Sequence, residues 1–201
     1  MPTDERRAQL LALRRRIFNE HAYDEVSIDD IAAAAKISKG LLYHYFPNKK
    51  QFYVEVVREA ADELVRCTAP VATLAPADRL THALDAYLDF VDRNARAYVT
   101  LMRSGVGNDP EVAAVVEGTR KALVRRILSD GLGLSRPRPL VRLALRGWIG
   151  FVEAVSLDWL DRKEPERPAV RGLLAATLVS TLAAVLGLDP RSGLPGDLLA
   201  R

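Results

Sequence analysis

Residues 27–46, SIDDIAAAAKISKGLLYHYF, constrain the fold of this chain more than any other stretch. The first half predicts a short helix, because Ser27 is a good N-cap and two acidic residues follow it in the first turn, where the helix dipole favours negative charge. Apolar side chains then recur at helical spacing on one face: Ile28, Ile31, Ala32 and Ala35. A tight turn is expected at Lys36 and Ile37, where this pattern breaks.

A second short helix is predicted from Ser38, its N-cap, to about Phe46. Pro47 ends it, because proline disfavours the α conformation in the preceding residue. The side expected to be buried carries Ile37, Leu41, Leu42, Tyr45 and Phe46. The side expected to face outward carries Lys39, Gly40, Tyr43 and His44. Two helices of this length share too small a core to stand alone, so a covering helix is expected over residues 5–21, with an inner stripe of Leu10, Leu13, Ile17 and Phe18.

Two short helices joined in this way can present the second helix to the major groove of DNA, where its N-terminal residues meet base edges. Lys39 lies at that end and is the candidate for contacting a guanine, while Gly40 allows close backbone approach. The other candidate DNA contacts are hydroxyl, phenol, imidazole and ammonium groups that can reach phosphate or bases: Ser27, Ser38, Tyr43, His44 and Lys49. The alternative is that Tyr43 and His44 only pack at a helix–helix edge.

The pattern S-I-x-x-I-A-x-x-A-x-I-S-K-G-x-L-Y-x-Y-F-x-N-K resembles the N-terminal DNA-binding domain of the TetR family of transcriptional repressors, over residues 5–60. The resemblance implies a helix-turn-helix domain followed by a helical domain that encloses a ligand. Three positions depart from the family pattern. Lys36 replaces a usual glycine, Leu41 stands where a threonine or serine often contacts phosphate, and Asp29 is acidic where some members have a base-reading arginine.

The chain of 201 residues is 49% apolar and 27% charged, which is an ordinary globular composition for one or two domains and too apolar for disorder. The net charge of +3 is not by itself typical of nucleic-acid binding. Cys67 is the single cysteine and excludes an internal disulfide. No basic-then-apolar signal segment is evident at the N-terminus, so a cytoplasmic protein is expected.

Helical periodicity continues to residue 188 without a convincing strand, so the prediction is an all-α fold of about nine helices. The expected domains are a helix-turn-helix domain at residues 1–47, a connecting helix at 48–67, and a ligand-binding and dimerisation domain at 68–201. Within the last domain, helices are expected at about residues 77–94, 96–103, 110–130, 140–162 and 169–188.

The apolar run at residues 172–188 admits two interpretations. It is slightly shorter than the roughly 20 residues that a membrane span needs. A helix that is apolar on all sides also belongs in a core or an interface, and this is the interpretation we favour, with no membrane partner.

Catalysis is not expected, because no nucleotide-binding loop or nucleophile motif is present, and no metal or cofactor is expected because His21, His44 and His82 lack ligand-like spacing. The resemblance implies instead a small-molecule effector, and the scarcity of inward charges favours an apolar or amphipathic one. Candidate ligand-binding side chains are Tyr87, Phe90, Tyr98, Met102, Trp148 and Phe151. Helical spacing leaves open whether each lines a pocket or the core.

A single helix-turn-helix covers too few base pairs for a specific site, so a homodimer is expected to read two half-sites of a palindromic operator, with recognition helices about 34–36 Å apart or a multiple of that. The predicted dimer surface is built from the helices at 140–162 and 169–188. The last helix has one face with Leu174, Leu178, Thr181, Leu182 and Val185 and another with Leu173, Thr177 and Ala184, one for its own domain and one for the partner. Two alternatives remain: a DNA-binding regulator without an effector, and an all-α protein that has lost DNA binding.

Overall fold

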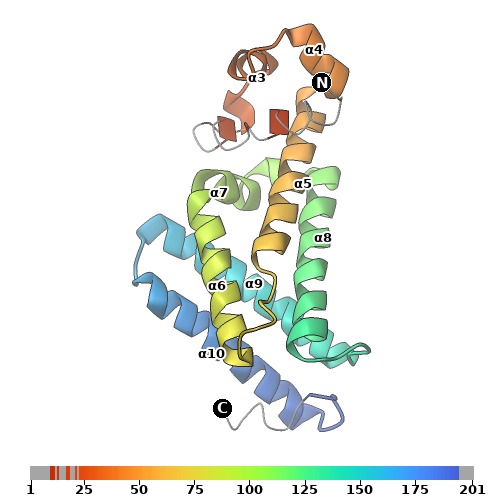
Figure 1. Ribbon diagram of the computed structural model, residues 1–201, viewed down its shortest axis with the longest axis vertical. Coiled ribbons are helices and arrows are strands. Elements are labelled where there is room, and N and C mark those ends of the chain that lie inside the picture. Colours follow the sequence, from red (N-terminus) through yellow and green to blue (C-terminus); the bar gives the residue numbers. More distant parts are fainter. Residues whose placement is uncertain (1–9, 12, 14–16, 19–20, 22, 195–201) are drawn as a thin grey trace. The chain divides into compact units, whose positions relative to one another are not determined.

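The computed structural model describes residues 10, 11, 13, 17, 18, 21 and 23–194 of the chain. Within these residues the regular structure is entirely helical, which confirms the predicted all-α fold (Figure 1). The α-helices are α3 (Ile28–Ala34), α4 (Lys39–Tyr45), α5 (Lys49–Cys67), α6 (Pro76–Arg93), α7 (Ala95–Arg103), α8 (Pro110–Arg126), α9 (Pro139–Arg162) and α10 (Arg167–Leu188). Short turns of other helix types are η1 (Tyr23–Glu25), η2 (Gly105–Asn108) and η3 (Ile127–Gly131).

The chain divides into two compact units, and each is built from two separate segments. Unit 1 contains residues 1–63 and 93–117, and unit 2 contains residues 64–92 and 118–201. These units are defined by which residues pack together. The predicted boundaries after residues 47 and 67 instead separate parts with different functions, so they stay predictions.

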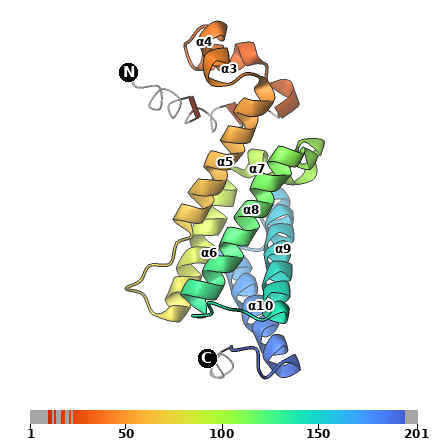
Figure 2. The same cartoon turned by 90° about the vertical axis from the view of Figure 1, so that its right-hand side faces the viewer.

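The core of unit 1 joins the short helices α3 and α4 to the first turns of α5, beside which they lie (Figures 1 and 2). Phe46 and Phe52 are almost completely buried, and their rings meet edge to face with centroids 5.0 Å apart. Phe18 contacts Tyr53 in the same way at 5.3 Å. The helix expected at residues 5–21 falls mostly outside the described residues. Of its described members, Leu10, Leu11, Ile17 and Phe18 are buried in this core, and Leu13 is partly buried against it.

Unit 1 also contains a segment that is distant in sequence, namely α7, η2 and the start of α8. Val112 of α8 is 1% exposed in the unit 1 core, and Ala97, Leu101 and Val115 pack against it. The turn between α7 and α8 requires a glycine at position 107, because a Cβ atom there would lie 2.3 Å from the carbonyl oxygen of Leu101. Residues 105–108 between the two helices form the short helical turn η2.

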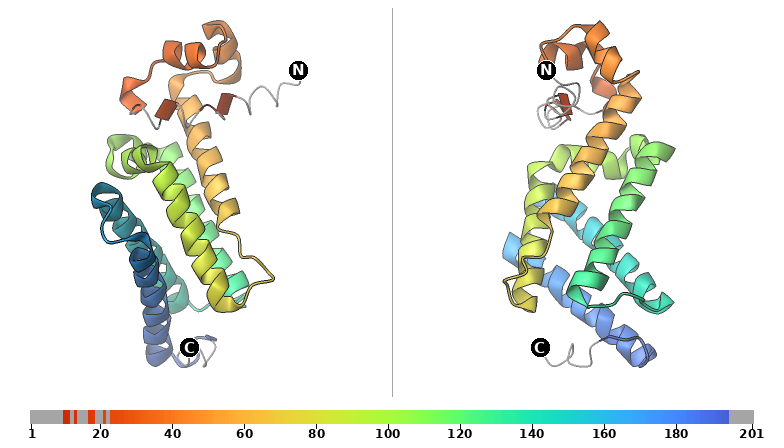
Figure 3. Two further views of the ribbon diagram at one scale, coloured as in Figure 1. Left: turned by 60° about the vertical axis from the view of Figure 1, so that its left-hand side comes forward. Right: turned by 45° about the vertical axis from the view of Figure 1, so that its right-hand side comes forward.

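In unit 2, α10 packs against α9 (Figure 3). The indole N–H of Trp148 donates to the carbonyl oxygen of Leu174 at 3.1 Å, so this aromatic residue lies between the two helices. Ion pairs join α10 to α6: Arg171 contacts Asp85 at 2.7 Å and Arg167 contacts Asp89 at 2.5 Å. These two ion pairs thus hold the N-terminal turns of α10 beside α6.

The two sides of α10 differ in burial. Val170, Leu174, Leu178, Leu182 and Val185 are buried in unit 2. On the other side, Leu173 is 48% exposed and Val179 is 40% exposed. By length and composition alone α10 could span a membrane, but core helices of soluble proteins meet the same criteria. The five buried side chains favour the interpretation of a core helix with one uncovered face.

Candidate nucleic-acid interface

The helix α3 begins at the N-cap that the sequence predicts. The Ser27 hydroxyl accepts from the backbone N–H of Asp30 at 3.1 Å, and the Asp30 carboxylate accepts from the backbone N–H of Ser27 at 2.8 Å. This reciprocal pair is a capping box, which satisfies two backbone donors that the helix leaves free. The hydrogen bonds from Ser27 also lower the pKa of the Asp30 carboxyl.

The turn between α3 and α4 depends on Lys36, which has a left-handed conformation with φ of 55°. The next backbone N–H, that of Ile37, donates to the carbonyl oxygen of Ala32 at 3.0 Å and closes the end of α3. A residue with a Cβ atom in this conformation costs on the order of 1 kcal/mol. The lysine therefore occupies a position that glycine would fill without strain.

The helix α4 starts at Ser38, whose hydroxyl accepts from the backbone N–H of Leu41 at 3.2 Å. Leu42 and Phe46 face the core at 0% and 1% exposure. The prediction that Leu41 is also buried was wrong, because its side chain is 38% exposed. Successive residues of a helix are turned by about 100°, so a helix of two turns cannot direct both Leu41 and Leu42 at one small core.

The outward side of α4 carries the side chains that the sequence assigned to it. Lys39, Gly40, Tyr43 and His44 are all exposed. Tyr45, in contrast, is partly buried and packs against the unit 1 core. The four predicted contacts on α4 thus form one solvent-facing surface, which we call the reading face. Their role in DNA binding stays a prediction.

Lys39 has a partner that sequence reasoning missed. Its ammonium lies 3.0 Å from each of the two carboxylate oxygens of Asp29 in the first turn of α3. Hydrogen bonding to this carboxylate raises the pKa of Lys39. The signal in the sequence was an acidic residue and a basic residue, each in the first turn of one of two adjacent helices.

Lys49 and Lys50 begin α5 and differ in their surroundings. The Lys49 ammonium lies 4.3 Å from the centroid of the Tyr23 ring. Lys50 forms ion pairs with Glu111 at 2.8 Å and Asp109 at 3.0 Å. These contacts raise the pKa of Lys50 and lower the pKa of both carboxyls, so all three groups are charged at neutral pH. Lys50 is thereby neutralised within unit 1, and Lys49 is the better candidate for phosphate.

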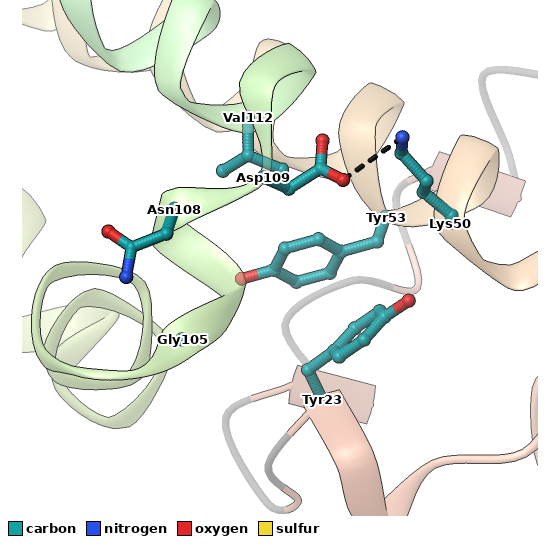
Figure 4. Close-up of a pocket in the computed structure, with 7 residues that line it drawn as sticks. All are labelled: Tyr23, Lys50, Tyr53, Gly105, Asn108, Asp109 and Val112. Atoms are coloured by element: carbon teal, nitrogen blue, oxygen red, sulfur yellow. Dashed lines mark ion pairs between the residues drawn. The ribbon is translucent and has the colours of Figure 1, made fainter.

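A surface pocket lies beside this ion pair (Figure 4). Its lining comes from η1, α5, η2 and the start of α8: Tyr23, Lys50, Tyr53, Gly105, Asn108, Asp109 and Val112. The sequence predicted none of them as ligand-binding residues, because they come from segments far apart in the chain.

The predicted ligand-binding residues lie elsewhere and are divided between the two units. In unit 2, Tyr87, Phe90 and Trp148 are buried, while Phe151 is 37% exposed on α9. Tyr98 and Met102 on α7 belong to unit 1 and are partly exposed. Trp148 is also engaged by hydrogen bonds to α10. The assignment of the six to one pocket stays a prediction.

Both parts of the chain match known families. Residues 10–56 match the family described as bacterial regulatory proteins, tetR family. Residues 76–183 match the tetracyclin repressor-like C-terminal domain. The second match alone spans more than half of the chain.

The chain belongs to the TetR family.

Individual relatives agree with this membership. A TetR-family transcriptional regulator from Streptomyces coelicolor, known from its crystal structure, shares 33% sequence identity with this chain. The two structures superpose with a TM-score of 0.87, over 96% of this chain and 87% of that one. The transcriptional activator FasR of Mycolicibacterium smegmatis is 29% identical over 176 residues, or 82% of this chain and 77% of FasR. The structure of Bacillus subtilis FadR in complex with stearoyl-CoA shares the fold at 16% identity, with a TM-score of 0.65 and coverage of 87% of this chain and 96% of that one.

Membership of the TetR family makes this chain a DNA-binding transcriptional regulator and not an enzyme. Its helix-turn-helix consists of α3, the turn at Lys36 and α4.

Proposed function

We propose that the protein is a ligand-responsive repressor that binds a palindromic operator as a homodimer and is released by an apolar or amphipathic small molecule. The observation that carries the proposal is the reading face of α4. Its exposed residues stand opposite Leu42 and Phe46, which anchor the helix in the unit 1 core. A helix held in this way presents its outward side to the major groove with little freedom to turn.

Each predicted DNA contact has a distinct role in the proposal. Lys39 donates to a guanine, and Gly40 lets the backbone approach the DNA. Tyr43 and His44 reach bases or phosphates from the same face. Ser27 and Ser38, as N-caps of α3 and α4, and Lys49 at the start of α5 contact phosphate oxygens.

The homodimer is supported by apolar surface left uncovered on α9 and α10. Leu143 and Phe151 on α9 are 70% and 37% exposed, and Leu173 and Val179 on α10 are exposed as well. We propose that these residues form one apolar patch, because large exposed apolar patches mark protein–protein interfaces. Paired about a two-fold axis, these helices form a four-helix interface, so that each homodimer carries two reading faces for two half-sites.

The effector is proposed to bind in the helical region that the C-terminal family match covers, residues 76–183. The aromatic side chains of this region support an apolar or amphipathic ligand, and a protein of the same fold holds stearoyl-CoA. The protein acts on DNA in the cytoplasm. FasR is named as an activator, so activation is the second candidate, and a reporter gene behind the bound operator distinguishes the two.

Replacing Lys39 with alanine is expected to weaken operator binding and to relax the preference at one base position, by roughly 1–3 kcal/mol for a bidentate contact. The matched control is Lys49→Ala, which should weaken binding to all sequences alike and flatten the dependence on salt concentration. Fluorescence anisotropy with operator and scrambled duplexes at several salt concentrations measures both. An unchanged affinity and base preference in Lys39→Ala would show that Lys39 does not read a base.

A ligand panel tests the effector part of the proposal. Fatty acids, acyl-CoA esters and neutral apolar compounds are compared for their effect on thermal unfolding and on operator binding. At least one class is expected to raise the melting temperature and to release DNA, because a ligand that binds only the folded protein stabilises it. If ligands raise the melting temperature but none releases DNA, the protein binds DNA without control by these compounds.

A further inference from the structure

Asp29 and Lys39 lie on different helices, and their side chains meet on the solvent-facing side of the helix-turn-helix. Asp29 is in the first turn of α3 and Lys39 is the first residue of α4. The ammonium nitrogen is 3.0 Å from each carboxylate oxygen, and the two side chains are 68% and 50% exposed. An ion pair as exposed as this contributes little to stability, so stability does not explain why a carboxylate stands here.

The helix itself does not require Asp29. A carboxylate in the first turn is stabilised by the helix dipole and can accept a hydrogen bond from a free backbone N–H. Asp30 already fills both roles. Asp30 faces Ser27, whereas Asp29 faces Lys39 at the start of the reading face. Asp29 is thus a negative charge on the surface that meets a polyanion, where it repels phosphate unless it contacts a donor on the DNA.

The major groove offers such a donor beside the acceptors that lysine prefers. Cytosine presents its N4 amino group and guanine presents O6 and N7. Within one base pair N4 and O6 are joined by a hydrogen bond, so they lie about 2.9 Å apart. The donor and acceptor of the Lys39–Asp29 pair lie 3.0 Å apart. The side-chain pair therefore matches the edge of the base pair in both spacing and polarity.

We propose that Asp29 is a specificity-determining residue that accepts from the N4 amino group of cytosine in the same base pair whose guanine Lys39 contacts. This inference rests on the proposed function. An adenine–thymine pair also offers a donor next to an acceptor, but thymine gives the lysine one acceptor beside a methyl group, whereas guanine gives it two. The Lys39–Asp29 pair thus selects a cytosine–guanine pair in one orientation.

The experiment selects binding sites from a library of random DNA duplexes with the full chain and with Asp29→Ala, Lys39→Ala and Asp30→Asn. Alanine is used at position 29 because asparagine would keep an oxygen that can accept from cytosine. The wild-type protein is expected to enrich one cytosine–guanine pair in each half-site. Asp29→Ala and Lys39→Ala should both lose that preference, by about ten-fold or more, at the same position. Asp30→Asn removes an equal charge from the neighbouring residue and should keep the preference.

The outcomes separate this inference from the proposed function. If the wild-type protein enriches a palindromic site and Asp29→Ala enriches the same site, Asp29 does not read a base although the protein is a sequence-specific regulator. Equal gains in affinity for random duplexes in Asp29→Ala and Asp30→Asn, with no change in base preference, would mean that Asp29 acts only through its charge and would overturn the inference. A wild-type protein that enriches no sequence would overturn the proposed function, and base reading with it.

Discussion

Replacing Val179 with glutamate is expected to convert the proposed homodimer into folded monomers. Val179 is 40% exposed on the uncovered side of α10, so the protomer tolerates a charge there. In a two-fold interface the same change appears on both chains, and each carboxylate is buried without a partner. Light scattering should report the monomer mass, and operator affinity should fall on the order of 100-fold or more because the two half-sites no longer bind together.

The adjacent residue provides the matched control. Leu178 is only 5% exposed and faces the core of unit 2, so Leu178→Glu should unfold the protomer itself, with loss of helical circular dichroism. Leu178 and Leu182 belong to the face of α10 that packs on its own domain, and a charge at either of them does not test the dimer alone. If Val179→Glu remains dimeric at micromolar concentration, the exposed face of α10 is not the interface.

Replacing Leu42 with alanine is expected to destabilise the helix-turn-helix strongly. Leu42 is 0% exposed and lies at the centre of the face that α4 turns to the unit 1 core. Truncating a fully buried leucine costs roughly 2–5 kcal/mol, partly because a cavity remains. Denaturant unfolding of the full chain, monitored by circular dichroism and by operator binding, should show the lower free energy of unfolding.

Leu41→Ala is the control, since it makes the same chemical change one residue away at 38% exposure. Its effect on the free energy of unfolding should be small, about 0.5 kcal/mol, as for other surface positions. Equal destabilisation by the two substitutions would mean that Leu41 is buried as the sequence pattern suggested.

The features that the sequence predicted correctly are local ones. The N-caps at Ser27 and Ser38 and the end of α4 before Pro47 follow from neighbouring residues in the chain. The tight turn expected at Lys36 and Ile37 is also present, and Lys36 has a positive φ there. Such signals act over a few residues, so they can be read without knowing what packs against each helix.

The features that escaped prediction depend on contacts between segments that are distant in the chain. Both Leu41 and Leu42 are apolar, but consecutive helical residues point about 100° apart, and the packing of α4 on the unit 1 core decides that Leu41 is the one left outside. Lys50 pairs with Asp109 and Glu111, which lie about sixty residues further along the chain, and no sequence pattern within α5 predicts this pairing. The same is true of the surface pocket, whose lining residues converge only in the folded chain.

The composition of unit 1 bears on the engineering of hybrid regulators. A transplant of residues 1–67 onto the effector domain of another protein would leave behind Val112, which belongs to the unit 1 core, and Ala97 and Leu101, which pack against it. It would also leave Lys50 without Asp109 and Glu111. The DNA-binding part of this protein is therefore not a portable module that ends with α5. A functional exchange has to carry residues 93–117 with it, or supply a recipient whose corresponding turn presents the same apolar and acidic side chains.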